Sequence, residues 1–500
     1  MRRTVILTLL LFLLCGGSHA VAPDLAAFAS VFDAEGFVVQ EGKLETYDVA
    51  AMVDAGLAPS CYANNPTAPY MVYKLPKGPG QTVNNTITDA PIRPENRGLW
   101  VDNRLRQDEV LVLFGETPPA CAYFSYRTYL ANRFFPGDPF GDGGAARRVF
   151  ASLGDTINNL DVRLADGTAG PFNGSVIVVS AANRKSAARV HAVLERTGFP
   201  AERVNDDVVP AALVRMGFNE RDDSFMLLHR VALFQDAAAG EAYMNRSFPV
   251  LRLTPKTVMP ADPYPVPTLA VRGSGNTSEI DLLPALDRLR DAILARHGTE
   301  KATEPETSIW IGEGYDGIQR GIDVLGEVRD TVYLRTGEFV LGQDDVAVFY
   351  GVNHAATGRA RYANLGVYGT RLLNGLAGVS DREFGNTAGE YLPGDPAAPL
   401  LYVWTLSRKP GTANTTVVPT VPGARGIPLD EPLFAGFRAY QDPATGVGPL
   451  WAELAYDRVI VFDGREPGGG PSSTVPPTTP GPGPTGRERP YRPASPWAGA

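Results

Sequence analysis

The chain of 500 residues is 44% hydrophobic and 20% charged, with a formal net charge of −9 at pH 7. This length exceeds what one hydrophobic core usually supports, so we expect two structured regions or one large interwoven body. The negative net charge, which is spread without long runs of like charge, argues against the basic face that a nucleic-acid partner requires.

Residues 1–20 have the layout of a cleavable secretory signal peptide, with a basic start, an apolar run over 5–14 and a small-residue exit at Ala20. Cys15 leaves a lipoprotein signal as an alternative, which the leucines just before it disfavour. No other stretch reaches the roughly 20 apolar residues of a membrane-spanning helix. We therefore expect a soluble protein that is secreted or periplasmic and has no membrane span.

Residues 21–140 form a predicted β-rich N-terminal region. A helical apolar pattern opens it, and extended runs separated by prolines follow, of which 70–75 is the clearest. Further strands are predicted at Val110–Phe114 and Tyr123–Tyr129, the second with aromatic residues among small or charged ones. This mixture predicts an aromatic wall that faces a core or a pocket.

Residues 141–260 form a predicted α/β region in which apolar strands alternate with amphipathic helices. The predicted elements are a strand at 175–179, helices at 184–196 and 211–216, a strand at 225–234, a helix at 237–244 and a strand at 250–253. Repetition of strand, helix and strand is typical of a sheet covered by helices.

Residues 261–465 form a predicted second α/β region. Its helix at Glu279–His297 carries apolar residues at helical spacing, and the last predicted strands are 401–406 and 459–462. Residues 466–500 are rich in Pro, Gly, Ser and Thr and are predicted to form a disordered tail. The chain as a whole predicts an α/β or α+β fold, with mixed sheets and covering helices.

Two stretches share one pattern, which indicates an internal duplication of a strand-loop-strand unit. Residues 107–116 and 343–354 each contain an acidic pair, an apolar strand and a glycine, and each leads through a polar loop into a Tyr-rich run. Duplicated elements often pack about a pseudo-twofold axis. We therefore expect the loops 116–122 and 352–361 to border one pocket.

Two cysteines, Cys61 and Cys121, remain after the predicted signal peptide. An oxidising compartment would allow them to form a disulfide, and two buried thiols are the alternative. Neither cysteine lies in a C-x-x-C pair, and no two histidines have the spacing of metal ligands, so no metal site is predicted. The sequence leaves the identity of any cofactor unknown.

His354 has the surroundings that best suit chemistry, because it lies in a polar loop between two predicted strands. We therefore take His354, as acid or base, and its neighbour Asn353 as candidate catalytic residues. The alternative is a loop histidine whose hydrogen bonds are made by the backbone.

Ser152–Ile157 is similar to the first block of the GDSL or SGNH hydrolases, in which Gly-Asp-Ser supplies a serine nucleophile. Here Thr156 stands at the nucleophile position, and no Asp-x-x-His follows near the C-terminus. The similarity therefore assigns no catalytic residue to this chain. The sequence also lacks a G-x-S-x-G nucleophile elbow and a phosphate-binding P-loop motif.

Arginine and tyrosine side chains in or near the predicted strands indicate how a ligand would be held. A guanidinium beside an aromatic wall suits bidentate binding of a carboxylate or phosphate. Arg230 lies in such a strand. The candidate substrate-binding residues around the two repeated units are Glu116, Tyr123, Tyr126, Arg127, Arg359 and Tyr362.

These features predict an exported protein with a cleft for a small polar or anionic molecule, and a hydrolase or lyase is the simplest enzyme that would fit. The alternative is a non-catalytic extracytoplasmic ligand-binding protein or a surface protein. The sequence does not decide between an enzyme and a binding protein.

Overall fold

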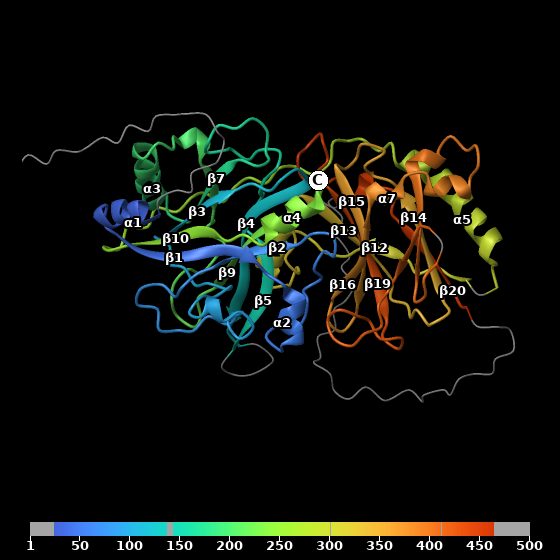
Figure 1. Ribbon diagram of the computed structural model, residues 1–500, viewed down its shortest axis with the longest axis horizontal. Coiled ribbons are helices and arrows are strands. Elements are labelled where there is room, and N and C mark those ends of the chain that lie inside the picture. The colour runs from blue at the N-terminus through green and yellow to red at the C-terminus, as the bar shows by residue number, and fades with distance from the viewer. Residues whose placement is uncertain (1–24, 138–143, 301, 412, 465–500) are drawn as a thin grey trace, which may run out of the picture.

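The computed structural model describes residues 25–137, 144–300, 302–411 and 413–464, so the predicted signal peptide and tail lie outside the described residues. The described chain forms 20 strands in three sheets and seven α-helices, which confirms the predicted mixture of helices and mixed sheets. Figure 1 shows two halves side by side, the first coloured blue to green and the second yellow to red.

The first half is built on one ten-stranded sheet, called the large sheet below. Its strand order is β5-β4-β9-β2-β1-β10-β3-β7-β8, with β6 paired to β4, and β7 and β8 run parallel. Its strands are β1 (Phe37–Thr46), β2 (Tyr70–Lys74), β3 (Val110–Glu116), β4 (Cys121–Phe135), β5 (Ala145–Ser152), β6 (Ile157–Asn158), β7 (Ser175–Ala181), β8 (Asn205–Val208), β9 (Ser224–Phe234) and β10 (Phe248–Pro255). The predicted regions 21–140 and 141–260 both contribute to this sheet, because β9 and β10 lie between strands of the earlier region.

Helices α1 (Leu25–Ala34) and α3 (Arg184–Arg196) pack with the large sheet around one apolar cluster, which includes Phe32, Val112 and Val190. α3 follows Asn183, whose side chain accepts hydrogen bonds from two backbone N–H groups of the first turn. Two further helices of this half are α2 (Val49–Asp54) and α4 (Ala237–Met244). Residues 211–216, predicted as a helix, form turns instead, and both backbone groups of Arg215 hydrogen-bond to Asp223 and not within a helix.

The second half is a sandwich of two five-stranded sheets. The outer sheet has the order β11-β20-β14-β17-β18, and the inner sheet has the order β12-β13-β19-β15-β16. The strands are β11 (Ala302–Thr303), β12 (Thr307–Ile309), β13 (Thr331–Thr336), β14 (Val346–Val352), β15 (Tyr362–Gly369), β16 (Gly375–Ser380), β17 (Leu401–Ser407), β18 (Thr415–Val417), β19 (Leu433–Tyr440) and β20 (Arg458–Phe462). Apolar side chains of both sheets, such as Phe349 and Phe437, fill the space between them.

In each sheet of the sandwich, the face that points away from the sandwich interior is also covered. Helix α5 (Leu283–His297) packs Leu286, Leu289 and Ile293 against the outer sheet, at the far right of Figure 1. The inner sheet instead meets the large sheet, because tyrosines of β13, β15 and β19 share a core cluster with residues of β4 and β9. The remaining helices are α6 (Gly314–Arg320) and α7 (Asp381–Phe384). The two halves are therefore joined by a buried, tyrosine-rich contact.

The two repeated stretches occupy different positions in the fold. In the first, β3 and β4 belong to one sheet and are separated by β10, β1, β2 and β9. In the second, β14 lies in the outer sheet and β15 in the inner sheet. The similar sequence patterns therefore lead to two different arrangements of strands.

The predicted disulfide is not formed, because Cys61 and Cys121 are both free and buried. Cys61 packs against α2, whereas Cys121 begins β4 and packs in the core between the halves. Burial raises the pKa of each thiol to about 12. This environment disfavours the thiolate that disulfide exchange requires. Among the described helices, none is long and apolar enough to cross a membrane.

Candidate functional site

A cavity of about 50 Å³ lies where the large sheet meets the inner sheet. A single buried water needs on the order of 10–15 Å³ by this measure, so the space suits a few waters or one small molecule. Arg230 of β9 and Tyr70 of β2 line it from the first half, and Tyr333 of β13 with Arg438 and Tyr440 of β19 line it from the second. Ligand sites occur preferentially at such contacts between structural units.

Arg230 is placed by the centre of the large sheet, where β9 pairs with β2 and β4. Its guanidinium donates a hydrogen bond to the carbonyl of Gly326, and its Nε has no partner in the described chain. The guanidinium lies 5.2 Å from the ring centre of Tyr129 and 5.7 Å from that of Tyr70. Cation–π attraction therefore offsets part of the cost of burying this charge.

Arg438 is placed by the inner sheet, in the middle of β19 between β13 and β15. It donates hydrogen bonds to the hydroxyl of Tyr368 (2.5 Å) and the carbonyl of Ala63 (3.1 Å). Its guanidinium also lies 5.3 Å from the ring centre of Tyr333 and 5.7 Å from that of Trp310. Both arginines are thus held by neutral groups.

No carboxylate of the described residues forms an ion pair with Arg230 or Arg438, and none lines the cavity. The hydroxyls of Tyr70 and Tyr440 accept hydrogen bonds from Asn65, and that of Tyr333 accepts one from the backbone of Val328. Burial raises the pKa of Tyr333, although the charges of Arg230 and Arg438 act to lower it. The Tyr333 hydroxyl therefore keeps its proton. The lining therefore offers hydrogen-bond donors and positive charge, and these groups suit an anion.

The backbone around this cavity adopts an uncommon conformation. Tyr62 (φ 54°), Ala63 (φ 58°), Phe150 (φ 35°) and Leu325 (φ 54°) all line it, and all have positive φ without being glycine. Such conformations cost on the order of 1–3 kcal/mol each and cluster at functional sites. Gly326 follows with φ 68°, where a Cβ would lie 2.6 Å from the Phe150 ring. The cavity is thus bordered by tightly constrained loops.

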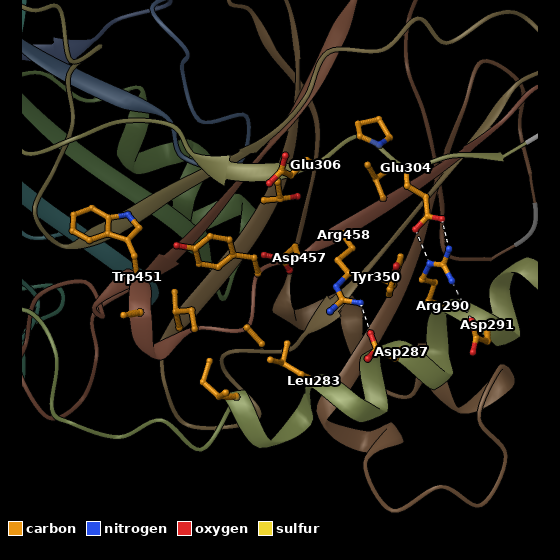
Figure 2. Close-up of a pocket in the computed structure, with 18 residues that line it drawn as sticks. Leu283, Asp287, Arg290, Asp291, Glu304, Glu306, Tyr350, Trp451, Asp457 and Arg458 are labelled. Atoms are coloured by element: carbon orange, nitrogen blue, oxygen red, sulfur yellow. Dashed lines mark hydrogen bonds and ion pairs between the residues drawn. The ribbon is translucent and has the colours of Figure 1, made fainter. Parts of the chain in front are cut away.

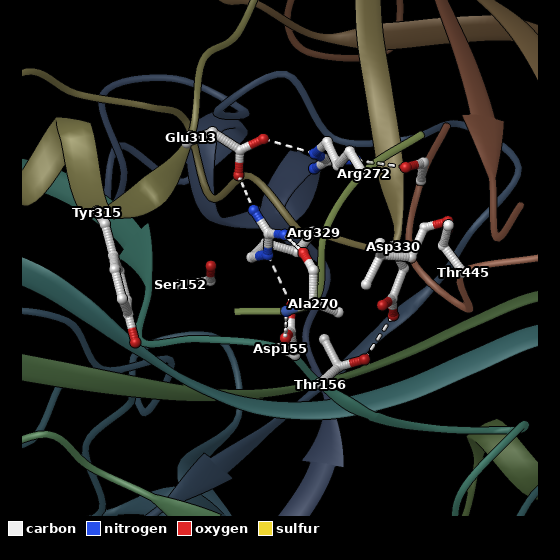
Figure 3. Close-up of polar contacts among 12 residues, drawn as sticks. Ser152, Asp155, Thr156, Ala270, Arg272, Glu313, Tyr315, Arg329, Asp330 and Thr445 are labelled. Atoms are coloured by element: carbon white, nitrogen blue, oxygen red, sulfur yellow. Dashed lines mark hydrogen bonds and ion pairs between the residues drawn. The ribbon is translucent and has the colours of Figure 1, made fainter. Parts of the chain in front are cut away.

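A polar network crosses the contact between the halves beside this cavity (Figure 3). Arg329 forms ion pairs with Asp155 of the first half and Glu313 of the second, and Glu313 also pairs with Arg272. Asp330 accepts hydrogen bonds from Thr156 (2.5 Å) and from a tyrosine of β4. The network thus joins the loop after β5 to the segment that leads into β13.

Two carboxyl groups of this contact titrate near neutral pH. Burial and the charge of Glu313 raise the pKa of Glu327 to about 7, although the hydrogen bonds from Ser152 act to lower it. Burial raises the pKa of Asp330 to about 6, against the hydrogen bonds from Thr156 and Tyr123. Glu327 follows the cavity residue Gly326, but it does not line the cavity.

The predicted residues of the first repeated unit are all engaged in the fold. The Tyr123 hydroxyl donates to Asp330, and the Tyr126 ring stacks on His229 with 4.2 Å between ring centres. Arg127 pairs with Asp207 at 2.7 Å, and Glu116 forms a bidentate pair with Arg246 on the surface. None of the four lines the cavity between the halves.

The predicted residues of the second unit divide between two places. The Asn353 side chain accepts hydrogen bonds from two backbone N–H groups of its own loop, and His354 contacts Glu279 and Asp457. Arg359 pairs with Asp442 and Glu453.

Tyr362 lies apart from these three, on β15, where its ring stacks on that of Tyr440. Tyr123 also packs against Tyr440, so these two of the eight predicted residues adjoin a ring that lines the cavity.

The sequence patterns did not identify Arg438, Tyr333 or Tyr440 as site residues. One feature of the sequence could have indicated Arg438. It is an arginine inside the apolar stretch Leu433–Tyr440, just as Arg230 is an arginine inside the apolar stretch Ser224–Phe234. Among the described residues, no group of three or more His, Cys, Asp or Glu side chains is placed to hold a metal ion.

No protein-family model matches the chain, and no curated protein matches it. Two solved structures are similar at 12% identity. One is an uncharacterized protein from Burkholderia cenocepacia, with a TM-score of 0.38, covering 88% of this chain and 87% of that one. The other is the VPA0106 protein from Vibrio parahaemolyticus, with a TM-score of 0.36, covering 82% of this chain and 94% of that one. Similarity at this level says nothing about function.

Proposed function

We propose that this protein binds a small anion, most simply a carboxylate, in the cavity between its halves. The observation that carries the proposal is that Arg230 and Arg438 both line this cavity while neither is ion-paired to a carboxylate of the described residues. An unpaired buried charge costs several kcal/mol, and an anion between the two guanidiniums would offset that cost. The tyrosine hydroxyls that line the cavity would add neutral donors.

Binding is favoured over catalysis by the position of the nearest titrating carboxyl. Glu327, with a pKa of about 7, could serve as a general acid or base, but it does not line the cavity and its Oε1 already accepts from Ser152. A ligand-binding role therefore requires fewer additional assumptions than a hydrolase or lyase.

The anion test measures the melting temperature and the dissociation constant of the protein with sodium formate, with sodium gluconate keeping ionic strength constant. We expect formate to stabilise the wild type and the Arg438→Met variant to lose this response. Hydrogen bonds to charged groups contribute about 1.5–3 kcal/mol, which corresponds to a rise in Kd of about ten- to a hundredfold. The Tyr47→Phe variant should bind formate several-fold more weakly, because Tyr47 lines the cavity and its hydroxyl has no partner in the described chain.

The matched control for the anion test is Arg335→Met. Arg335 lies on β13 of the same sheet, pairs with Glu338 and does not line the cavity, so its variant should keep the full formate response. Equal formate responses in the wild type and Arg438→Met, or no response in the wild type, would refute anion binding in this cavity.

We also propose that the protein is exported, which rests on the signal-like layout of residues 1–20. Mass spectrometry of the mature protein recovered from the periplasm or medium of an expressing bacterium should find Val21 as its first residue. Retention of Met1 in a cytoplasmic product would contradict export.

A further inference from the structure

A second, much larger cleft of about 920 Å³ opens on the second half and shares no lining residue with the cavity between the halves. It lies between α5, the segment Glu304–Thr307 that joins β11 to β12, and residues 451–459, which lead into β20. Its volume is within the range of sites that bind drug-sized ligands. Figure 2 shows Trp451 at one end of it and Arg290 at the other.

Two ion pairs that join α5 to neighbouring segments form a polar wall along one side of this cleft (Figure 2). Arg290 of α5 makes a bidentate pair with Glu304, with distances of 2.7 and 2.5 Å, and its Nη1 also contacts the adjacent Asp291 at 3.2 Å. Arg458 of β20 pairs with Asp287 of α5 at 2.8 Å. Each pair fixes the orientation of its partners, and each leaves further donor and acceptor sites open to a ligand.

Buried polar atoms around the cleft lack a hydrogen-bond partner in the described chain. The clearest two are the hydroxyl of Thr307 and the indole Nε1 of Trp451, which come from two separate segments that line the cleft. Buried polar atoms are almost always paired in folded proteins. Thr307 and Trp451 are half-buried, so a small rotation of either side chain would let a ligand in the cleft supply the missing partner.

The charge of the lining indicates the class of ligand. Carboxylates outnumber the two guanidiniums, so the cleft disfavours anions, in contrast to the cavity between the halves. Carboxylates accept hydrogen bonds, guanidinium and indole N–H groups donate them, and hydroxyls do both. A molecule with many hydroxyl groups matches such a mixed lining, because each of its hydroxyls both donates and accepts.

The aromatic side chains favour the same class. Trp451 and Tyr456 are half-buried and line the cleft, and a pyranose ring has an apolar C–H face that packs on aromatic rings. We infer that this cleft binds a neutral sugar, with the hydroxyl groups facing the two ion pairs and the C–H face on the aromatic residues. This site goes beyond the proposed anion cavity and is independent of it.

Saturation-transfer NMR with maltose, cellobiose and N,N′-diacetylchitobiose tests the inference, with spermidine as a cationic competitor. At least one disaccharide should receive saturation, and Arg290→Gln and Glu304→Gln should each weaken its binding by about tenfold. Both residues are partly exposed, so either variant should fold, and near-UV circular dichroism checks this. Trp451→Phe keeps an aromatic ring but removes the unpaired Nε1, and it should weaken binding several-fold.

The matched control is Arg288→Gln, on the same helix, because Arg288 pairs with Asp395 and does not line the cleft. It should bind the sugar as the wild type does, and formate binding should be unchanged in all four variants. No saturation of any disaccharide, an equal loss in Arg288→Gln, or binding of spermidine in place of the sugars would overturn the inference.

Discussion

Raising the pH from about 6.5 to 10 is expected to destabilise the second half by a few kcal/mol, because His354 then loses a proton that is held between two carboxylates. Its Nδ1 lies 2.9 Å from Glu279, and its Nε2 lies 3.7 Å from Asp457. Burial alone would lower the pKa of His354, but the charge of Glu279 and the contact with Asp457 raise it to about 10. At neutral pH the ring is therefore an imidazolium that joins the loop after β14 to the segments around Glu279 and Asp457.

The sign of the pH dependence follows from these pKa values. The folded pKa of His354 lies above the ordinary value of 6.5, so the folded state binds the proton more tightly than the unfolded state. Its contribution is complete below pH 6.5 and disappears as the pH rises toward 10. The pKa of Glu279 is lowered by His354 and other partners despite its burial, so its contribution is present above about pH 4.5 and disappears in acid.

Urea unfolding of the wild type and His354→Gln between pH 6 and 10 measures this effect. The variant should be less stable at pH 6 and should lose little further stability up to pH 10, whereas the wild type should decline. His297→Gln is the control, because burial and Arg296 lower the pKa of His297, so its protonation does not stabilise the fold and its replacement should leave the wild-type decline in place. Parallel curves for the wild type and His354→Gln would show that the imidazolium makes no such contribution. They would also leave His354 free to serve as the acid or base that its loop position suggests.

Replacing Glu109 with glutamine is expected to lower the free energy of unfolding by about 3–5 kcal/mol, because it leaves a buried guanidinium without a counter-charge. Arg252 and Glu109 are 0% and 1% exposed and pair at 2.8 Å between β10 and the start of β3. Glu109 also accepts hydrogen bonds from Thr254 (2.5 Å) and the backbone of Arg106 (2.9 Å). Arg252→Met should be similarly destabilising, because it leaves the carboxylate buried.

A double-mutant cycle separates the pair from its surroundings. The double variant, Glu109→Gln with Arg252→Met, should cost clearly less than the sum of the single changes, because neither charge is left alone. Arg196→Met is the control, since Arg196 pairs with Glu35 on the surface of the same half and should contribute about 0–1 kcal/mol. Single variants as stable as the control, by urea unfolding, would contradict a buried ion pair at this position.

The anion proposal and the Glu109 prediction concern different uses of buried arginine. Arg252 has a carboxylate beside it and is expected to be structural. Arg230 and Arg438 are also buried but lack an ion-paired carboxylate of the described residues, and they lie at a contact between two sheets where a small cavity remains. The signal for a ligand is therefore a buried cation that lacks an ion-pair partner and also lines a cavity.

Local periodicity determined the helices and most of the strands. The apolar spacing that predicted a helix at 184–196 reappears as α3, with Val190, Val193 and Leu194 buried on one face. The helix predicted from Glu279 begins as an α-helix at Leu283, because a 3-10 turn precedes it and proline occupies its first turn. In these segments one side of a helix or strand must be apolar for the chain to fold, so the pattern is visible in a short window of sequence.

Only the tertiary structure decided which strands are neighbours and which polar side chains meet. The stretch Leu433–Tyr440 was not predicted as a strand, because Gly436 and Arg438 interrupt its apolar run, yet it is central in the inner sheet. Arg438 meets the cavity that Arg230 lines only because that sheet packs on the large sheet. The repeated strand-loop-strand pattern predicted one shared pocket, but its two copies are built into different sheets with different neighbours. Such pairing depends on contacts between residues far apart in the chain, which a local pattern does not encode.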